Sequence, residues 1–237
     1  MAPVAIFRFS PTEGPAYFAE WLSSRGIGFE VITLDGGAAV PGDPRAFAGI
    51  GMMGGPMSVN DDLPWIEPLC RLLRDAVDAR VPIIGHCLGG QLLARALGAP
   101  VTTAREPEIG WSEVQTEGDG PAWFGGRSGF TTFQWHYETF ALPPGGVGVL
   151  TNPAVPNQAY VIDDRHVGLQ CHVEMTDALV ETWLAAGAHE LPAATRGRVQ
   201  SAATIRENLA ARVTALHAVA GDLYTRWARG LRDATAG

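Results

Sequence analysis

The sequence predicts an α/β fold in which helices cover both faces of a doubly wound, mostly parallel sheet, with a C-terminal helical extension. Short apolar runs alternate with segments of helical periodicity over most of the 237 residues, which is typical of strand–helix units. An apolar spacing of three and four residues then continues from 199 to 231. We therefore expect an α/β domain at residues 1–190 and a helical extension at residues 191–237.

The first half of the chain alternates most regularly. Strands are expected at 4–9, 29–34, 50–53 and 81–85, and helices at 17–24, 65–79 and 91–97. Glycine or proline bounds the short runs at 29–34 and 50–53, which predicts strands buried on both faces. The helix at 65–79 has one apolar face, formed by Ile66, Leu69, Cys70, Leu73 and Val77.

Beyond residue 100 the pattern is less regular, and strands are expected at 111–116, 131–135, 147–151, 158–163 and 167–171. The C-terminal periodicity predicts one long helix or two, with a break or bend at Gly221, because glycine inside a helix costs about 1 kcal/mol relative to alanine. Its apolar face either docks on the core of its own chain or forms a subunit interface in a homo-oligomer. The apolar positions are Val199, Ala202, Ile205, Leu209, Val213, Leu216, Val219, Leu223, Trp227 and Leu231.

Composition excludes several classes of function. The net charge is −8 and no basic cluster is present, so neither a nucleic-acid backbone nor an anionic membrane surface is an expected partner. All 17 basic residues are arginine, which excludes a P-loop lysine and Schiff-base chemistry. No apolar run approaches the roughly 20 residues of a membrane span, and the first residues do not resemble a secretory signal. With three cysteines, at least one thiol is free, and we expect a cytoplasmic protein.

The most informative stretch is residues 81–98, in which an apolar strand runs through Gly85-His86-Cys87-Leu88-Gly89 into a helix. This arrangement is typical of a nucleophile elbow, here with cysteine as the nucleophile. The flanking glycines leave room for a sharp turn that other residues would obstruct. A thiol at a helix N-terminus faces backbone N–H dipoles that favour the thiolate. We therefore expect Cys87 to be reactive, with His86 pointing away from it.

A nucleophilic cysteine needs a histidine partner, and that partner needs an orienting group. Two His-x-Glu pairs meet this requirement, His136 with Glu138 and His172 with Glu174. Residues two apart in an extended chain share a face, so each glutamate can reach its own histidine. The spacing alone does not choose between the pairs.

Acyl transfer also needs N–H donors for a developing oxyanion. The glycine-rich segment Gly54-Gly55-Pro56 follows an expected strand and exposes approachable backbone amides. The amide of Leu88, immediately after the nucleophile, is the second donor expected at an elbow.

With these motifs in view, the chain resembles a class I, triad-type glutamine amidotransferase domain, nearest to free-standing proteins related to the amidotransferase half of GMP synthetase. The resemblance spans roughly residues 4–190 and implies a flavodoxin-like three-layer fold. Its four motifs, in chain order, are Gly54-Gly55-Pro56-Met57-Ser58-Val59, Gly85-His86-Cys87-Leu88-Gly89-Gly90-Gln91, Gln134-Trp135-His136 and Gly168-Leu169-Gln170-Cys171-His172-Val173-Glu174.

The resemblance implies the catalytic roles. It makes Cys87 the nucleophile, His172 the base and Glu174 the orienting group, and it therefore favours the second His-Glu pair. It assigns the oxyanion N–H groups to Gly55 and Leu88.

The resemblance also implies a substrate-binding set. Gln91 would contact glutamine, and the backbone of Trp135 and His136 would contact its α-amino and α-carboxylate groups. Phenylalanine and proline are usual in this family where the chain has Cys171 and Val173, which changes the shape of the strand end but removes no catalytic group.

The implied activity is hydrolysis of the glutamine side-chain amide through a γ-glutamyl thioester, with no metal or organic cofactor. We expect no synthetase domain within the 237 residues, so a separate synthetase or acceptor protein is the expected partner for the ammonia. One alternative is a γ-glutamyl peptidase or hydrolase with the same site. Another is a non-catalytic regulatory subunit that binds through the C-terminal helix, against which the intact Cys87, His172 and Glu174 argue.

Overall fold

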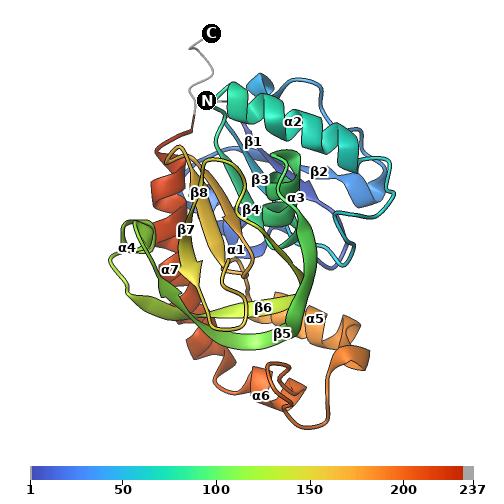
Figure 1. The fold of residues 1–237 in the computed structure, drawn as a ribbon, viewed down its shortest axis with the longest axis vertical. Coiled ribbons are helices and arrows are strands. Elements are labelled where there is room, and N and C mark those ends of the chain that lie inside the picture. Colours follow the sequence, from blue (N-terminus) through green and yellow to red (C-terminus); the bar gives the residue numbers. More distant parts are fainter. Residues whose placement is uncertain (1, 232–237) are drawn as a thin grey trace.

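The computed structural model describes residues 2–231, which form one nine-stranded sheet with helices on both faces (Figure 1). The strand order is β2-β1-β3-β4-β9-β8-β7-β5-β6. The strands are β1 Val4–Arg8, β2 Phe29–Thr33, β3 Gly49–Met52, β4 Ile83–His86, β5 Val101–Thr116, β6 Gly129–Phe140, β7 Gly146–Thr151, β8 Ala159–Ile162 and β9 His166–Leu169. The helices are α1 Ala16–Ser24, α2 Ile66–Asp78, α3 Leu88–Ala96, α4 Gly120–Trp123, α5 Asp177–Ala186, α6 Ala202–Arg206 and α7 Leu209–Ala228.

The α/β fold is confirmed, and the sheet is mixed. Strands β2, β1, β3, β4 and β9 pair in parallel, whereas β9, β8, β7, β5 and β6 pair antiparallel. Within the described residues, half of the strand pairings are therefore antiparallel, a larger share than the sequence predicts. The additional antiparallel pairing comes mainly from β5 and β6. These strands form a long ribbon, of which the sequence predicts only two short segments.

Two apolar layers hold the helices to the sheet. One contains side chains of α1, α5 and α7, and the other contains side chains of α2 and α3. Neighbouring residues of β1 alternate between the layers, because successive side chains of a strand point to opposite faces: Val4 and Ile6 join the first layer, and Ala5 and Phe7 the second. Every residue of β3 and β4 is buried, as expected for strands at the centre of a covered parallel sheet.

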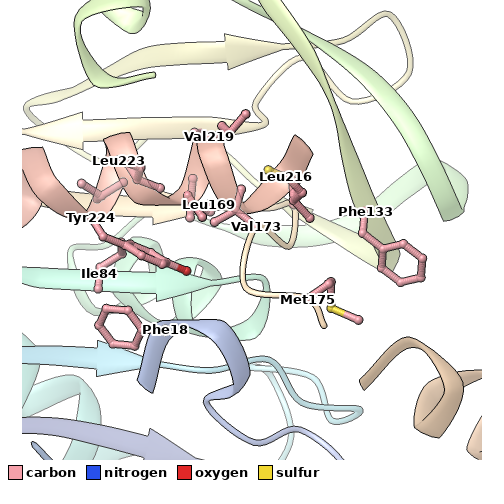
Figure 2. Close-up of a cluster of buried hydrophobic side chains, with 14 of the residues drawn as sticks. Phe18, Ile84, Phe133, Leu169, Val173, Met175, Leu216, Val219, Leu223 and Tyr224 are labelled. Carbon is pink, nitrogen blue, oxygen red and sulfur yellow. The ribbon is translucent and has the colours of Figure 1, made fainter. Parts of the chain in front are cut away.

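The C-terminal segment forms two helices, but the break does not lie at Gly221. The chain breaks between α6 and α7 at Asn208, which has a left-handed backbone with a φ of 54°, and α7 continues through Gly221. One face of α7 is covered by the core of its own chain, as Figure 2 shows for Leu216, Val219 and Leu223. The prediction of docking on the core is confirmed, and this face is not available as a subunit interface. Residues 232–237 of the predicted extension lie outside the described residues.

Two further expectations need correction. The strand at 29–34 is not buried on both faces, because β2 lies at the edge of the sheet and leaves the side chain of Val31 38% exposed. The ribbon strands β5 and β6 are longer than the segments 111–116 and 131–135 predicted for them. In the described part of the chain, no helix combines the length and the apolar character needed to cross a membrane.

Candidate active site

Cys87 occupies the turn between the end of β4 and the start of α3. Its backbone has a φ of 48° and a ψ of −105°, a combination that costs an L-residue of the order of 1–3 kcal/mol and is typical of functional sites. A Cβ atom on Gly85 would collide with the backbone of Gly89, and one on Gly89 would lie 2.6 Å from the Met52 side chain. The sharp turn therefore depends on the glycines on both sides of Cys87.

The segment after β9 places His172 and Glu174 side by side. Nδ1 of His172 donates a hydrogen bond to Oε1 of Glu174 at 2.7 Å, and both side chains are 1% exposed. The backbone N–H of His172 donates to the carbonyl of Phe133 in β6 at 2.8 Å, which fixes the segment against the ribbon. The ring of Trp183 meets the His172 ring edge-on, with centroids 4.7 Å apart. The imidazole is therefore held in one orientation.

Burial and charge set the protonation of this pair. Burial alone would raise the pKa of Glu174, but the charge of His172, the neighbouring His86 and the hydrogen bond from His172 together lower the pKa to about 2. Burial alone would lower the pKa of His172, but Glu174 and the nearby Cys87 raise it well above its ordinary value. His172 is therefore an imidazolium at neutral pH. Its Nε2 has no hydrogen-bond partner among the described residues and can exchange a proton with a ligand.

Backbone amides beside the cysteine are free to bind an anion. The loop after β3 is tied to its neighbours, since Met53 N–H donates to Phe7 and Met53 C=O accepts from Gly89. A Cβ atom on Gly55 would lie 2.5 Å from the Leu88 side chain, so the loop and the start of α3 are in contact. No described residue accepts a hydrogen bond from the amide of Gly55 or Leu88. Both N–H groups are therefore available to a ligand oxygen.

A cavity of about 730 Å³ opens over the cysteine. Of the eight predicted site residues, the cavity lining includes six, all except Leu88 and Glu174. The six are Gly55, Cys87, Gln91, Trp135, His136 and His172. Part of the lining comes from the end of α5 and the residue after it, with Trp183, Ala186 and Gly187.

Gln170 and the backbone of Trp135 lie close to the sulfur of Cys87, and Gln91 binds Gln170. The Gln91 amide donates to Oε1 of Gln170 at 3.2 Å, and the Gln170 amide lies 3.6 Å from Sγ of Cys87. The carbonyl oxygen of Trp135 lies 4.0 Å from the same sulfur. The indole of Trp135 donates to Glu190 at 3.1 Å, which fixes the rim of the cavity.

The first His-x-Glu pair does not form. His136 points its Nε2 at Glu108, 3.3 Å away, and its Nδ1 at the carbonyl of Glu138, 3.1 Å away. The Glu138 carboxylate instead accepts a hydrogen bond from the hydroxyl of Ser58 at 2.9 Å. Arg198, from the segment after α5, lies 3.2 Å from Glu108 and helps to hold its carboxylate in place.

The sequence motifs missed several residues around the site. Glu13 lines the cavity from the loop after β1, and Glu108 supports His136 from a strand whose central residues were not predicted as a strand. His86 does not line the cavity, as expected, but it lies next to Glu174: its Nε2 accepts a hydrogen bond from Tyr224 of α7 at 3.0 Å and is 4.0 Å from the Glu174 carboxylate. Burial lowers the pKa of His86, which keeps it neutral.

A metal centre is not indicated within residues 2–231, where no cluster of three or more His, Cys, Asp or Glu side chains could hold an ion.

Known proteins resemble the chain in sequence and in structure. The glutamine amidotransferase-like protein YfeJ of Salmonella typhimurium is 29% identical over 205 residues, which cover 82% of this chain and 85% of that protein. The glutamine-hydrolysing GMP synthase of Aeropyrum pernix is 33% identical over 147 residues, 60% of this chain but only 28% of that protein. The crystal structure of a glutamine amidotransferase from Methylobacillus flagellatus has a TM-score of 0.96 and 43% identity, covering 98% of this chain and 96% of that one.

A family model agrees with these relatives. The model described as glutamine amidotransferase class-I matches residues 19–184, well over half of the sequence and including both Cys87 and the His172–Glu174 pair. The chain therefore belongs to the class I glutamine amidotransferase family.

Proposed function

We propose that this chain hydrolyses the side-chain amide of glutamine through Cys87, His172 and Glu174. One observation carries the proposal: a strained cysteine at a helix N-terminus and a histidine line the same cavity. A buried carboxylate orients this histidine by accepting its hydrogen bond at 2.7 Å. Membership of the family supports the reaction class, which is transfer or hydrolysis at the glutamine amide.

In the first half of the reaction, the Cys87 thiolate attacks the amide carbonyl carbon. The carbonyl oxygen becomes an oxyanion and accepts hydrogen bonds from the free N–H groups of Gly55 and Leu88. The His172 imidazolium passes its Nε2 proton to the leaving nitrogen, the carbon–nitrogen bond breaks, and ammonia departs. A γ-glutamyl thioester remains on Cys87.

In the second half, His172 is neutral and accepts a proton from water. The water oxygen attacks the thioester carbonyl, the same two amides stabilise the second oxyanion, and the thiolate of Cys87 leaves as glutamate is released. Glu174 stays ionised throughout, because its low pKa keeps the proton on His172. The chain's own groups thus balance every proton transfer without a cofactor.

Substrate binding is assigned to Gln91, Trp135 and His136, which line the cavity beside the cysteine. The backbone of Trp135 and His136 would contact the α-amino and α-carboxylate groups. The Glu138 carbonyl accepts a hydrogen bond from Nδ1 of His136, and Nε2 lies 3.3 Å from Glu108, so the ring is held in place in the cavity wall.

The released ammonia is useful only if another reaction consumes it. The match to GMP synthase covers 28% of that protein, so most of that relative lies outside the match. We infer that a synthetase or another acceptor protein works with this chain, and that free glutamine alone is hydrolysed slowly. A peptide flip in the Gly54-Gly55 segment would withdraw one oxyanion donor, which costs roughly 2.7–4 kcal/mol of barrier and would make glutamine turnover by the lone protein slow but still measurable.

The cavity also favours a second candidate, a γ-glutamyl peptidase or hydrolase that uses the same residues. A volume of about 730 Å³ is in the range that holds drug-sized ligands, and is more than one amino acid fills. Steady-state kinetics on the purified chain separate the two. Slow glutamine turnover that rises when an acceptor protein is added supports the amidotransferase, whereas fast turnover of γ-glutamyl peptides but not of glutamine supports the peptidase. Fast glutamine turnover by the chain alone would contradict the coupling to a partner.

A further inference from the structure

A carboxyl group lies beside the reacting residues, and the mechanism above does not use it. Glu13 belongs to the loop between β1 and α1 and lines the same cavity as Cys87 and His172. The loop is held in place by its backbone, since the indole of Trp183 donates to the carbonyl of Thr12 at 2.9 Å. Trp183 is also the ring that packs against His172. The same side chain therefore positions Glu13 and the catalytic imidazole relative to each other.

The Glu13 carboxyl group and the edge of the His172 ring both lie beside Gly54. A Cβ atom added to Gly54 would collide with Oε2 of Glu13 and would lie 3.0 Å from Cε1 of His172. Cε1 is bonded to Nε2, the nitrogen that protonates the leaving group in the proposed reaction. A leaving nitrogen that reaches Nε2 therefore also comes within reach of Glu13.

Glu13 has no partner of its own. Three carboxylates line the cavity, and two of them, Glu138 and Glu190, accept hydrogen bonds from neighbouring side chains. Among the described residues, no group donates to the Glu13 carboxyl, and no arginine lines the cavity. Burial raises the pKa of Glu13 to about 7, although the charge of His172 opposes the shift. The half-buried carboxyl therefore faces the cavity with no protein donor, which leaves it open to a ligand N–H group.

We propose that Glu13 is a further catalytic residue, whose carboxylate accepts a hydrogen bond from an N–H group of the leaving amide. The inference rests on the amide hydrolysis proposed above. As Nε2 of His172 gives its proton to the leaving nitrogen, that nitrogen gains positive charge, which the adjacent carboxylate stabilises until the carbon–nitrogen bond breaks. The bonding electron pair stays on the nitrogen, and ammonia or a primary amine departs. Glu13 therefore favours leaving groups that carry N–H, and gives no help to an ester.

The test compares two substrates that differ in the leaving atom. We expect Glu13→Gln to lower kcat/KM for glutamine about 10- to 100-fold, as for loss of a hydrogen bond to a charged group, and to change kcat/KM for the γ-glutamyl methyl ester by less than about threefold. Glu20→Gln, an exposed carboxylate of α1 outside the cavity, is the matched control and should change neither value. Alkylation of Cys87 by a chloroketone analogue of glutamine checks that the variant keeps its site.

Each outcome decides a different claim. Equal losses for the amide and the ester would mean that Glu13 only supports the structure, and unchanged kinetics for both would mean that it has no role; either overturns this inference alone. A wild-type chain that cleaves neither substrate would overturn the proposed function and the inference with it.

Discussion

The two histidines that line the cavity differ in what their ring nitrogens already bind. Both nitrogens of His136 face protein oxygens, at 3.3 Å from Glu108 and 3.1 Å from the carbonyl of Glu138. His172 donates Nδ1 to the Glu174 carboxylate at 2.7 Å, and its ring lies near enough to Cys87 for the thiol to raise its pKa. A proton-transfer group needs a ring that is close to the nucleophile and oriented by a third group. The geometry therefore fits His172 for catalysis and His136 for binding.

This difference predicts separable kinetics. We expect His172→Ala to lower kcat by roughly 10³-fold or more with a modest change in KM, because it removes the proton donor and acceptor. We expect His136→Ala mainly to raise KM, because it loosens the binding wall. Steady-state glutamine hydrolysis by both variants checks the assignment, and loss of kcat in His136→Ala with near-normal turnover in His172→Ala would reverse it.

The residues that the sequence identified came from two sources. Spacing alone indicates an elbow at Cys87 and two possible His-Glu pairs, whereas the family resemblance chose His172 and added Gln91, Trp135 and His136. Glu13 and Glu108 have no such signal, because the residues near them lie far along the chain and only the tertiary fold brings them together.

At the scale of single elements, the glycines of this chain differ in whether a larger residue would fit in their place. Gly221 lies inside α7, and a Cβ atom there would meet its nearest neighbours at 3.9 and 4.0 Å, an ordinary contact distance. Gly85 lies at the end of β4, where a Cβ atom would collide with the backbone of Gly89. Helical periodicity alone does not separate a tolerated glycine from a required one.

We therefore expect Gly221→Ala to raise the free energy of unfolding by about 0.5–1 kcal/mol, because alanine loses less backbone entropy in a helix. Gly85→Ala, the matched substitution, should lower it and impair the elbow. Urea unfolding of both variants at pH 7.5 measures these effects. A destabilised Gly221→Ala variant would show that α7 is packed more closely on α1 than its contact distances indicate.

The helix break shows a second limit at this scale. The apolar spacing continues without interruption across residues 206–209, so it predicts a helix where the chain turns at Asn208. Asparagine tolerates the left-handed conformation that the turn requires, and this local preference outweighs the periodicity.

At the scale of the whole molecule, the strands of the parallel half and the antiparallel strands β7 and β8 could be predicted to within about three residues, whereas the full length of β5 and β6 could not. Buried parallel strands such as β3 and β4 are continuous apolar runs, which sequence patterns detect well. The ribbon of β5 and β6 has exposed positions and a register shift between Thr103 and Glu108, which interrupts the alternation of apolar and polar residues. The sheet therefore contains more antiparallel pairing than the local patterns indicate.

The pH dependence of stability should reflect a buried histidine in β9. Burial lowers the pKa of His166 from 6.5 to about 4, so the folded protein holds it neutral while the unfolded chain binds a proton below about pH 6.5. Stability contributed by neutral His166 is therefore lost as the pH falls from about 6.5 toward 4. We expect the free energy of unfolding to fall between pH 7.5 and 4.5 in both proteins. The fall should be smaller in His166→Leu than in the wild type, and the two falls should differ by up to about 2 kcal/mol. Parallel pH profiles for the two proteins would contradict this.

We propose that Cys87 is the nucleophile of a glutamine site. Its thiol lines the cavity, unlike the thiols of Cys70 and Cys171. Cys70 and Cys171 are at most 1% exposed, and burial raises the pKa of Cys171 to about 12. The most direct measurement is peptide mapping by mass spectrometry after reaction with a chloroketone analogue of glutamine. We predict a single label on Cys87, prevented by excess glutamine and greatly slowed in His172→Ala. Labelling of Cys70 or Cys171, or labelling of Cys87 that glutamine does not prevent, would contradict the account.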